Sequence, residues 1–403
     1  MNFDDTPHEA RFRAEARTWL AAHRFDYRGF RGEHGLFDAV RRWQQIKFDG
    51  GWGCLHWPRE YGGRAAAAIE NVIFGQEEEA AGMSLLSTVN TITIGMAAAT
   101  IMHCGTEAQK TRHLRRIARG EEIWCQLFSE PAAGSDLAGI RTRAVRDGDH
   151  WVVNGQKVWT TYAQYADWAI LIARSDPTVP KHKGLTYFLL DMKTPGVQVR
   201  PIRQASGGSD FNEVFFDDVR IPDACRVGNE GDGWRVAINT LMNERAAITS
   251  IFPTNFDDAW ALARRTPMHD GMAMDDASVR ALLADWHVWG RGLQNFGLRM
   301  RSALSQGKTP GPESSVAKLM LGGRRQALLS ELLDVLDIGA AAEASGQPFG
   351  LQFAFLRVIG NRLEGGTDEV LRNIIAERVL GLPPEPRVDK DTPFNRIPSG
   401  QPG

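Results

Sequence analysis

The sequence is poor in cysteine, since its 403 residues include only Cys54, Cys104, Cys125 and Cys225. No two of them form a CxxC pair, and none lies near a histidine at the spacing of metal ligands. The sequence therefore indicates no metal site. Isolated thiols are typical of proteins that keep their cysteines reduced, and we expect a cytoplasmic location.

An excess of charge and long apolar runs are also lacking. The formal net charge is −2, so neither nucleic acid nor an anionic membrane is expected as the main partner. The first residues, MNFDDTPHEARFRAEA, are polar and acidic where a signal peptide is basic and then apolar. Because we find no run of about 18 apolar residues, we expect no transmembrane helix.

The composition is otherwise that of a globular protein. Hydrophobic residues make up 43% of the chain and charged residues 24%, which is ordinary for this class. A chain of 403 residues is too long for one compact core and long enough for two or three.

The chain up to Gly120 has a helical pattern of apolar residues. Thr6-Pro7 is a typical helix start, and Thr106 with Gln109 forms a capping box for a helix that ends near Gly120. Further helices are expected over 38–48, 67–81 and 91–103.

From Glu121 to about Val227 the apolar period changes to two, which indicates a mostly antiparallel β region. Short apolar strands are expected at 168–173, 186–190 and 213–216. Helical patterns return over 234–264, 278–306, 313–345 and 367–380. Helices, then strands, then helices predict an α+β fold with separate domains. The end of the chain is rich in Pro and Gly, and we expect a loose tail there.

The stretch from Leu127 to Tyr162 is the most informative part of the chain. Its first part, EPAAGSD, contains small residues that allow a ligand to approach the main chain. Asp147-Gly148 and Asn154-Gly155 are strong tight-turn dipeptides around a β-rich segment, so a short antiparallel meander is predicted. The loop and the Trp159-Thr160-Thr161 end together suit a large, flat, hydrogen-bonding ligand.

These motifs carry a family resemblance. EPAAGSD followed by NGQKVWTTYAQYADW resembles the flavin-binding middle domain of the acyl-CoA dehydrogenases. The resemblance continues through FNEVFFDDVRIP, VGNEGDGW and GGTDEVLRNIIAERVLGLP, and it covers roughly residues 3–383. It implies an N-terminal helical domain (1–122), a middle antiparallel β domain (123–232), a C-terminal four-helix-bundle domain (233–383) and a flexible tail (384–403).

The resemblance implies FAD as cofactor and an acyl-CoA thioester as substrate. The residues that it places at the flavin are Gln126, Phe128, Ser129, Trp159 and Thr161, with Thr367 and Glu369 reaching the cofactor from the C-terminal domain. Ser135 lies where the family contacts the CoA or pantetheine portion. Each of these residues also has a purely structural interpretation. Trp159 would be a core tryptophan, Ser129 and Ser135 would form turns, and Thr367 would be a helix N-cap that needs no ligand.

The family reaction needs a carboxylate near the α-carbon of the substrate, where it removes a proton as the β-hydrogen leaves as hydride to the flavin. Family members carry this glutamate in one of two places. In one of them this chain has Gly365, with Glu364 one residue away. The other is the helix after the β domain, which reads LMNER here, so the resemblance implies Glu244 as base and Arg245 beside it. Glu364 is the backup, and an ordinary solvated helix pair is the alternative for Glu244 and Arg245.

The chain departs from the family pattern in two elements that reach FAD across a subunit interface. The region 263–271 has arginines without the matching phenylalanine, and 336–342 lacks paired glycines. The chain is therefore similar to a bacterial branch that acts on bulky, branched or steroid side-chain acyl-CoA as unlike-subunit assemblies. A homo-oligomer, or a heterotetramer with a homologous subunit, is implied, with an electron-transfer flavoprotein as acceptor. A non-catalytic or FAD-sharing subunit, and a flavin oxidase or monooxygenase, are the competing hypotheses.

Overall fold

The fold is that of a computed structural model, which describes residues 5–30, 34–248, 256–305, 311–337, 351–386 and 389–398. The chain divides into two compact units. We call Asp4–Arg203, Ser209–Ala247 and Glu385–Gly403 the N-terminal unit. Met1–Phe3, Gln204–Gly208 and Ile248–Pro384 form the C-terminal unit. Each unit is described by itself.

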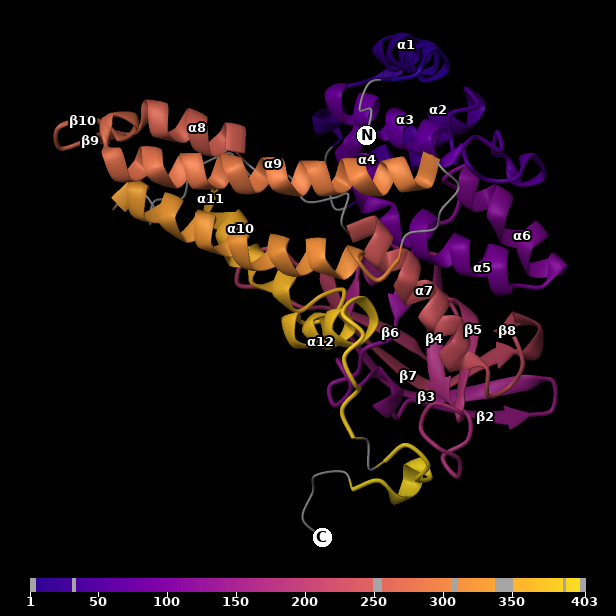
Figure 1. The fold of residues 1–403 in the computed structure, drawn as a ribbon. Coiled ribbons are helices and arrows are strands. Elements are labelled where there is room, and N and C mark those ends of the chain that lie inside the picture. The colour runs from indigo at the N-terminus through magenta and orange to yellow at the C-terminus, as the bar shows by residue number, and fades with distance from the viewer. Residues whose placement is uncertain are drawn as a thin grey trace. The chain divides into compact units, whose positions relative to one another are not determined.

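The N-terminal unit begins with helices (Figure 1). The predicted start at Thr6 is confirmed, because its side chain accepts from Glu9 N and Pro7 occupies the first turn. The capping box of Thr106 and Gln109 is confirmed in the same way. The helices are α1 (Pro7–His23), α2 (Gly35–Asp49), α3 (Ala68–Ala80), α4 (Ser84–Val89), the π-helical segment η3 (Ile92–Ala98), α5 (Ala99–Cys104) and α6 (Glu107–Ala118).

One helical stretch, Ser84–Cys104, is long and apolar enough to cross a membrane by length and composition alone. No transmembrane helix was expected from the sequence, because polar Ser, Thr and Asn interrupt the apolar residues of this stretch. Met96, Ala97, Ala98 and Ile101 of this stretch are buried in the core shared with the sheet. The core of the unit therefore accounts for its apolar character.

The rest of the N-terminal unit is built around one eight-stranded sheet in the order β6-β7-β3-β2-β4-β5-β8, with β1 paired to β4. All pairs are antiparallel except β1 with β4 and the short contact of β2 with β4. The mostly antiparallel prediction is thus confirmed. The strands are β1 (Trp124–Leu127), β2 (Arg143–Asp147), β3 (His150–Thr161), β4 (Trp168–Arg174), β5 (Leu185–Asp191), β6 (Val197–Pro201), β7 (Phe211–Pro222) and β8 (Arg226–Val227).

Two cores flank this sheet. One includes Ile101 and Leu114 of the helices with Ile170 and Leu189 of the strands. The other includes Trp151, Leu171 and Phe188 among others. Helix α7 (Gly233–Ile248) follows the sheet and contributes Val236 and Ala237 to the first core. Helices α5, α6 and α7 thus share the first of these cores with the sheet.

The predicted meander is only half correct. Asp147-Gly148 forms the turn between β2 and β3, with Gly148 at φ +62°. Asn154-Gly155 forms no turn, because β3 runs through it from His150 to Thr161. Gly155 has φ +147° and lies at a register shift against β7, and a Cβ on it would stand 2.6 Å from Thr142 Oγ1. The glycine therefore serves a β-bulge and a close approach of two strands.

The C-terminal unit is mainly helical. Its helices are α8 (Phe256–Arg265), α9 (Ala277–Ser305), α10 (Ser314–Leu336), α11 (Leu351–Val358) and α12 (Asp368–Ile374), the last continued by the π-helical segment η10 (Ile375–Val379). A small hairpin of β9 (Pro267–Met268) and β10 (Gly271–Met272), which the sequence analysis did not predict, follows α8. Ala259, Leu283, Trp286 and Leu328 form the core of α8, α9 and α10.

The end of the chain differs from the expected loose tail. Residues 389–398 pack on the loop between β4 and β5, where Phe394 N donates to Val179 O at 2.9 Å and Asn395 N donates to Pro177 O at 2.9 Å. Backbone hydrogen bonds of this kind hold a Pro-rich segment whose own secondary structure is a single 3₁₀ turn, Phe394–Arg396.

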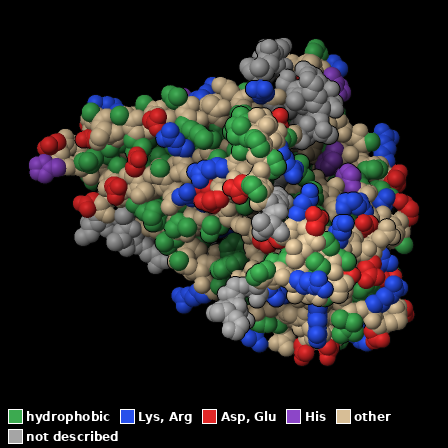
Figure 2. Space-filling model, turned by 60° about the horizontal axis from the view of Figure 1, so that its bottom comes forward, with side chains coloured by type: hydrophobic (Ala, Val, Ile, Leu, Met, Phe, Trp, Pro, Cys, Tyr) green, Lys and Arg blue, Asp and Glu red, His purple; other side chains and the backbone are tan. Residues whose placement is uncertain are grey.

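Charges are mixed on the surface. Figure 2 shows Lys and Arg side chains interspersed with Asp and Glu over the described part of one face. This distribution agrees with the net charge of −2.

Candidate flavin and thioester site

The segment after β1 lies directly beside the last part of β3. Val158 N donates to Ser129 O at 2.9 Å, and Lys157 Nζ donates to Phe128 O at 2.9 Å. These contacts bring together two groups of residues that the sequence analysis assigned to one ligand. Gln126 is half-buried in β1, opposite Ile170 of β4.

A buried ion pair fixes this arrangement, and sequence reasoning missed it. Lys157 Nζ lies 2.8 Å from Glu130 Oε1, and both side chains are almost fully buried. Burial lowers the pKa of Lys157 to about 8, against the attraction of Glu130. Burial also opposes ionisation of Glu130, but the Lys157 ammonium and the hydrogen bonds from Arg141 and Thr142 together hold the pKa of Glu130 below its usual value. The loop after β1 and strand β3 are thus joined by a charged contact inside the protein.

The remaining bonds of Glu130 reach the next part of the loop. Arg141 N donates to Glu130 Oε2 at 2.6 Å, and Thr142 N donates to Glu130 Oε1 at 3.0 Å. Glu130, the first residue of the EPAAGSD segment, therefore also binds the backbone just before β2. The sequence feature that could have revealed this ion pair is Lys157 itself, because a lysine at an inward-facing position of a strand needs a buried partner.

Trp159 projects from the sheet at a β-bulge. Its backbone has φ +60°, which is unusual for a residue other than glycine, and the register against β7 shifts between Lys157 and Thr160. The Trp159 side chain is 59% exposed, which excludes the alternative of a core tryptophan. Its ring stands edge-on to Phe211, with 6.0 Å between the ring centroids. Thr161 pairs with Phe211 in the ladder and is half-buried.

The bulge also leaves polar atoms without partners among the described residues. Thr160 Oγ1 and Asn212 Oδ1 are buried without a hydrogen bond in that part of the chain. Thr160 and Asn212 face each other across the β3–β7 ladder. An exposed tryptophan, a half-buried threonine and unsatisfied polar atoms together suit a flat ligand with hydrogen-bonding edges.

Ser135 is exposed in the EPAAGSD loop. Arg174 holds the following turn from inside, because it donates to Ile140 O at 3.0 Å and to Ala138 O at 2.5 Å. Burial lowers the pKa of Arg174 to about 10. The loop that presents Ser135 is therefore supported by buried charged side chains.

Helix α7 carries the predicted base. Glu244 and Arg245 lie in this helix, but their side chains are outside the described residues. One turn earlier, Thr240 Oγ1 lies 3.0 Å from Tyr187 Oη of β5 and 2.7 Å from Thr100 Oγ1 of α5, and all three side chains are fully buried. These hydroxyl contacts fix the face of α7 on which residues 240 and 244 both lie.

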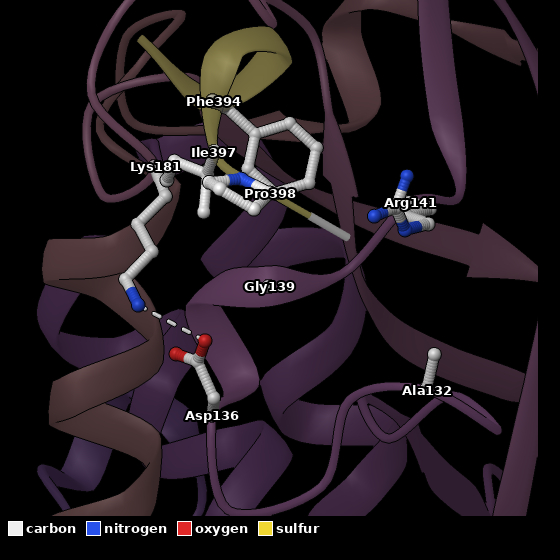
Figure 3. A pocket seen from close by; sticks show the side chains of 8 residues that line it. All are labelled: Ala132, Asp136, Gly139, Arg141, Lys181, Phe394, Ile397 and Pro398. Carbon is white, nitrogen blue, oxygen red and sulfur yellow. Dashed lines mark hydrogen bonds and ion pairs between the residues drawn. The ribbon is translucent and has the colours of Figure 1, made fainter. Parts of the chain in front are cut away.

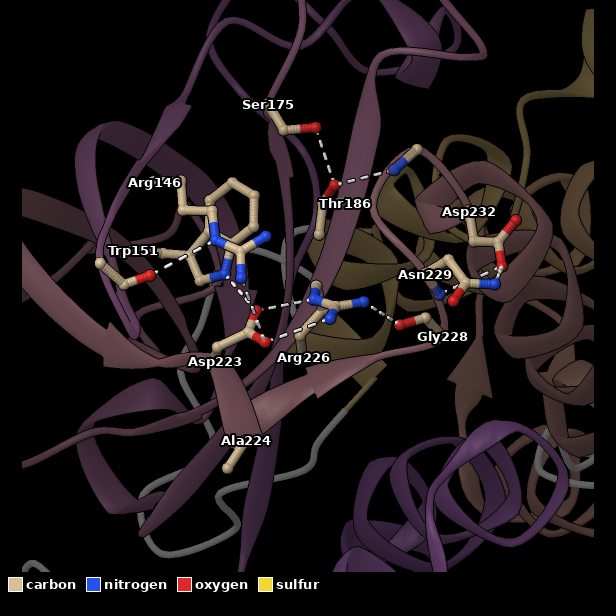
Figure 4. A network of polar contacts seen from close by, with 12 residues as sticks. Arg146, Trp151, Ser175, Thr186, Asp223, Ala224, Arg226, Gly228, Asn229 and Asp232 are labelled. Atoms are coloured by element: carbon tan, nitrogen blue, oxygen red, sulfur yellow. Dashed lines mark hydrogen bonds and ion pairs between the residues drawn. The ribbon is translucent and has the colours of Figure 1, made fainter.

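A polar network leads from the sheet into α7 (Figure 4). Arg226 Nε donates to Asp223 Oδ1 at 2.8 Å, and Arg226 Nη1 donates to Gly228 O at 2.6 Å. Gly231 N donates to Thr186 Oγ1 at 3.2 Å. A Cβ on Gly233 would lie 2.6 Å from the Leu185 carbonyl, so only glycine allows α7 to start this close to β5.

The remaining predicted residues lie in the C-terminal unit. Thr367 is the N-cap of α12, and its hydroxyl accepts from Val370 N at 3.3 Å. Glu369 is exposed, and its own backbone N–H and the Thr367 hydroxyl hold its pKa below the usual value. The backup base Glu364 accepts from Arg357 Nη2 at 2.8 Å and from Asn361 Nδ2. Glu364 is thus bound to two side chains of its own unit.

Three family models match the chain. The N-terminal, middle and C-terminal domains of acyl-CoA dehydrogenase match residues 6–121, 125–219 and 231–380. Acyl-CoA dehydrogenase IpdE1 from Mycobacterium tuberculosis is 38% identical over 385 residues, which cover 93% of this chain and 98% of that relative.

Two solved structures extend the comparison. The ChsE4-ChsE5 complex from Mycobacterium tuberculosis is similar with a TM-score of 0.81 and 32% identity, covering 96% of this chain and 100% of the matched chain. The Tcur3481-Tcur3483 steroid ACAD gives a TM-score of 0.78 and 26% identity, covering 96% and 100%.

Proposed function

This chain belongs to the acyl-CoA dehydrogenase family, and we propose that it desaturates an acyl-CoA thioester to the trans-2-enoyl-CoA. Members of the family are oxidoreductases that act on a CH–CH group, and their cofactor is FAD. The observation that carries the proposal is the contact of the Phe128–Glu130 segment with Lys157 and Val158. It brings the segment after β1 beside the last part of β3, next to the exposed Trp159.

The residues at this contact fit a flavin. Phe128 and Ser129 lie on one side, and Trp159 and Thr161 follow from β3, with hydroxyl groups and an exposed aromatic ring available. FAD, when bound, supplies the acceptor for the hydride that leaves the β-carbon. Ser129, Thr161 and neighbouring backbone N–H groups would hold the ring and stabilise negative charge at its edge. Gln126, and Thr367 and Glu369 from the C-terminal unit, are proposed as further contacts.

The proposed base is Glu244. Its carboxylate takes the α-proton while the β-hydrogen leaves with its electron pair, so that the double bond forms between the two carbons. A partly desolvated carboxylate has a pKa near the operating pH, which this step requires. The anchoring of α7 through Thr240 supports the assignment, because it holds the helix rigidly one turn before Glu244. Arg245 and Ser135 are proposed to contact the thioester.

The proposed substrate is a bulky or steroid-type acyl-CoA, and the proposed assembly contains a homologous subunit. Both proposals are supported by the similarity to the Tcur3481-Tcur3483 steroid ACAD and to the ChsE4-ChsE5 complex. The departures from the family pattern at 263–271 and 336–342 also favour a partner that completes the cofactor site. The same observations favour one alternative, in which this chain shares FAD with an active partner. We propose an electron-transfer flavoprotein as acceptor.

The test is the visible spectrum of the purified chain, followed by anaerobic addition of a panel of acyl-CoA thioesters. A yellow protein whose absorbance bleaches with a bulky thioester is the expected result. If the chain is colourless alone and becomes yellow only when produced with a homologous partner, the shared-cofactor alternative replaces the homo-oligomer. A yellow protein that no thioester bleaches would contradict the proposed reaction.

A further inference from the structure

The C-terminal segment, residues 389–398, lies beyond the last family match, which ends at residue 380. It packs on the loop between β4 and β5, and Pro393 forms a β-bridge with Pro180. Asp389 Oδ2 lies 2.7 Å from Lys181 Nζ, so an ion pair ties the segment to the same loop. A segment with two backbone hydrogen bonds and an ion pair to one loop is a built part of that surface.

Phe394 joins this segment to the buried support of the EPAAGSD loop. The guanidinium carbon of Arg174 lies 3.5 Å from the centre of the Phe394 ring, a close cation–π contact. Arg174 also donates to the carbonyls of Ala138 and Ile140. The ring thus covers the arginine that holds the turn after Ser135.

The segment encloses a pocket beside Ser135. Its volume is about 500 Å³, and it is lined by Ala132, Asp136, Gly139, Arg141, Lys181, Phe394, Ile397 and Pro398 (Figure 3). Three of these residues come from the C-terminal segment and supply apolar surface. Ala132 and Asp136 belong to the loop that presents Ser135, so the pocket lies beside that loop.

The charges in the pocket leave one cation for a ligand. Lys181 is held between two carboxylates, Asp136 Oδ2 at 2.9 Å and Asp389 Oδ2 at 2.7 Å. Arg141 has no carboxylate in ion-pair contact within the described ranges, and its guanidinium lies 5.6 Å from the centre of the Phe394 ring. A guanidinium beside an aromatic and apolar wall suits a phosphate carried by a heterocyclic base.

We propose that the C-terminal segment completes a binding pocket for the phosphorylated nucleotide end of the CoA thioester. Arg141 contacts the 3′-phosphate, and Phe394 and Ile397 provide apolar contact for the adenosine. This inference rests on the proposed function, since it assigns the far end of the same substrate. It also gives a role to a segment that lies outside the family match.

The test is calorimetric titration of the full-length holoprotein with CoA and with 3′-dephospho-CoA. The wild type is expected to prefer CoA. Arg141→Gln should weaken CoA binding by about tenfold or more, as expected for loss of a charged hydrogen bond to phosphate, and change dephospho-CoA binding little. Phe394→Ala should weaken both ligands. Arg220→Gln, which alters an exposed arginine paired with Asp147, is the control and should change neither.

Equal affinity of the wild type and Arg141→Gln for CoA would overturn the inference. Competition by inorganic phosphate as strong as that by CoA would also overturn it, because the site would then be an anion site without nucleotide recognition. If Phe394→Ala does not fold, Arg141→Gln still decides the matter. Failure of the proposed function is distinguishable, because it appears as a flavin that no thioester reduces, whereas these titrations measure binding alone.

Discussion

Replacement of Lys157 with methionine tests whether the buried ion pair holds the candidate site together. The variant removes the ammonium that contacts Glu130 Oε1 at 2.8 Å and Phe128 O at 2.9 Å. Glu130 then keeps two backbone N–H donors but is a buried carboxylate that has lost its ion-pair partner. Breaking a buried pair on one side typically costs about 3–5 kcal/mol, a large part of a usual stability of about 5–15 kcal/mol.

The assay is urea unfolding of wild type, Lys157→Met and the double variant with Glu130→Leu, with FAD retention measured on each. We expect the single variant to lose about 3–5 kcal/mol and to release FAD, since Phe128 loses its tether. The double variant should recover much of the stability, because apolar replacement of a buried pair is often nearly neutral. A loss below about 1 kcal/mol for Lys157→Met, the level of an exposed pair, would refute the reasoning.

Three further predictions concern other parts of the N-terminal unit. Arg226 and the Trp151 indole hold the pKa of Asp223 at about 2. This carboxylate therefore stabilises the fold above its unfolded pKa of about 4, and the stabilisation is lost as the pH falls toward 2. Asp223→Asn should flatten that part of a curve of unfolding free energy against pH. Gly184→Ala places a Cβ 1.8 Å from Asp176 O. It should cost about 3 kcal/mol or more of unfolding free energy and lower the melting temperature strongly. Gly75→Ala, which adds a Cβ in open space on a helix, should instead stabilise the protein by about 0.5–1 kcal/mol. Trp159→Ala should change the unfolding free energy by less than about 0.5 kcal/mol because the side chain is exposed, yet reduce FAD retention measured by absorbance; equal retention would remove Trp159 from the flavin site.

The helix ends show what local sequence can predict. The helix start at Thr6 and the capping box of Thr106 with Gln109 were both predictable, because the groups that cap each helix lie three residues apart. The turn at Gly148 was predictable for the same reason. The turn predicted at Asn154-Gly155 was wrong, because this glycine belongs to a β-bulge that Thr142 approaches closely. Local sequence does not reveal such an approach by a distant residue.

The candidate site shows where tertiary contacts decide. Family motifs led to Phe128, Ser129 and Trp159, and the structure brings their segments together. The ion pair that joins them links residues 27 positions apart, so no local pattern connects Lys157 with Glu130. The docking of Phe394 on Arg174 was likewise invisible, since a Pro-rich end without helical or strand periodicity predicts a loose tail.

The most direct test of the central claim compares wild type, Glu244→Gln and Glu364→Gln in anaerobic flavin reduction by the thioester that bleaches the wild type. Absorbance first establishes that each protein carries FAD. We predict that Glu244→Gln stays yellow and loses about a hundredfold or more in reduction rate, the usual contribution of a general base. Glu364, which is bound to Arg357, should tolerate the same change within about tenfold. A Glu244→Gln protein that binds FAD and is reduced at the wild-type rate would contradict the account.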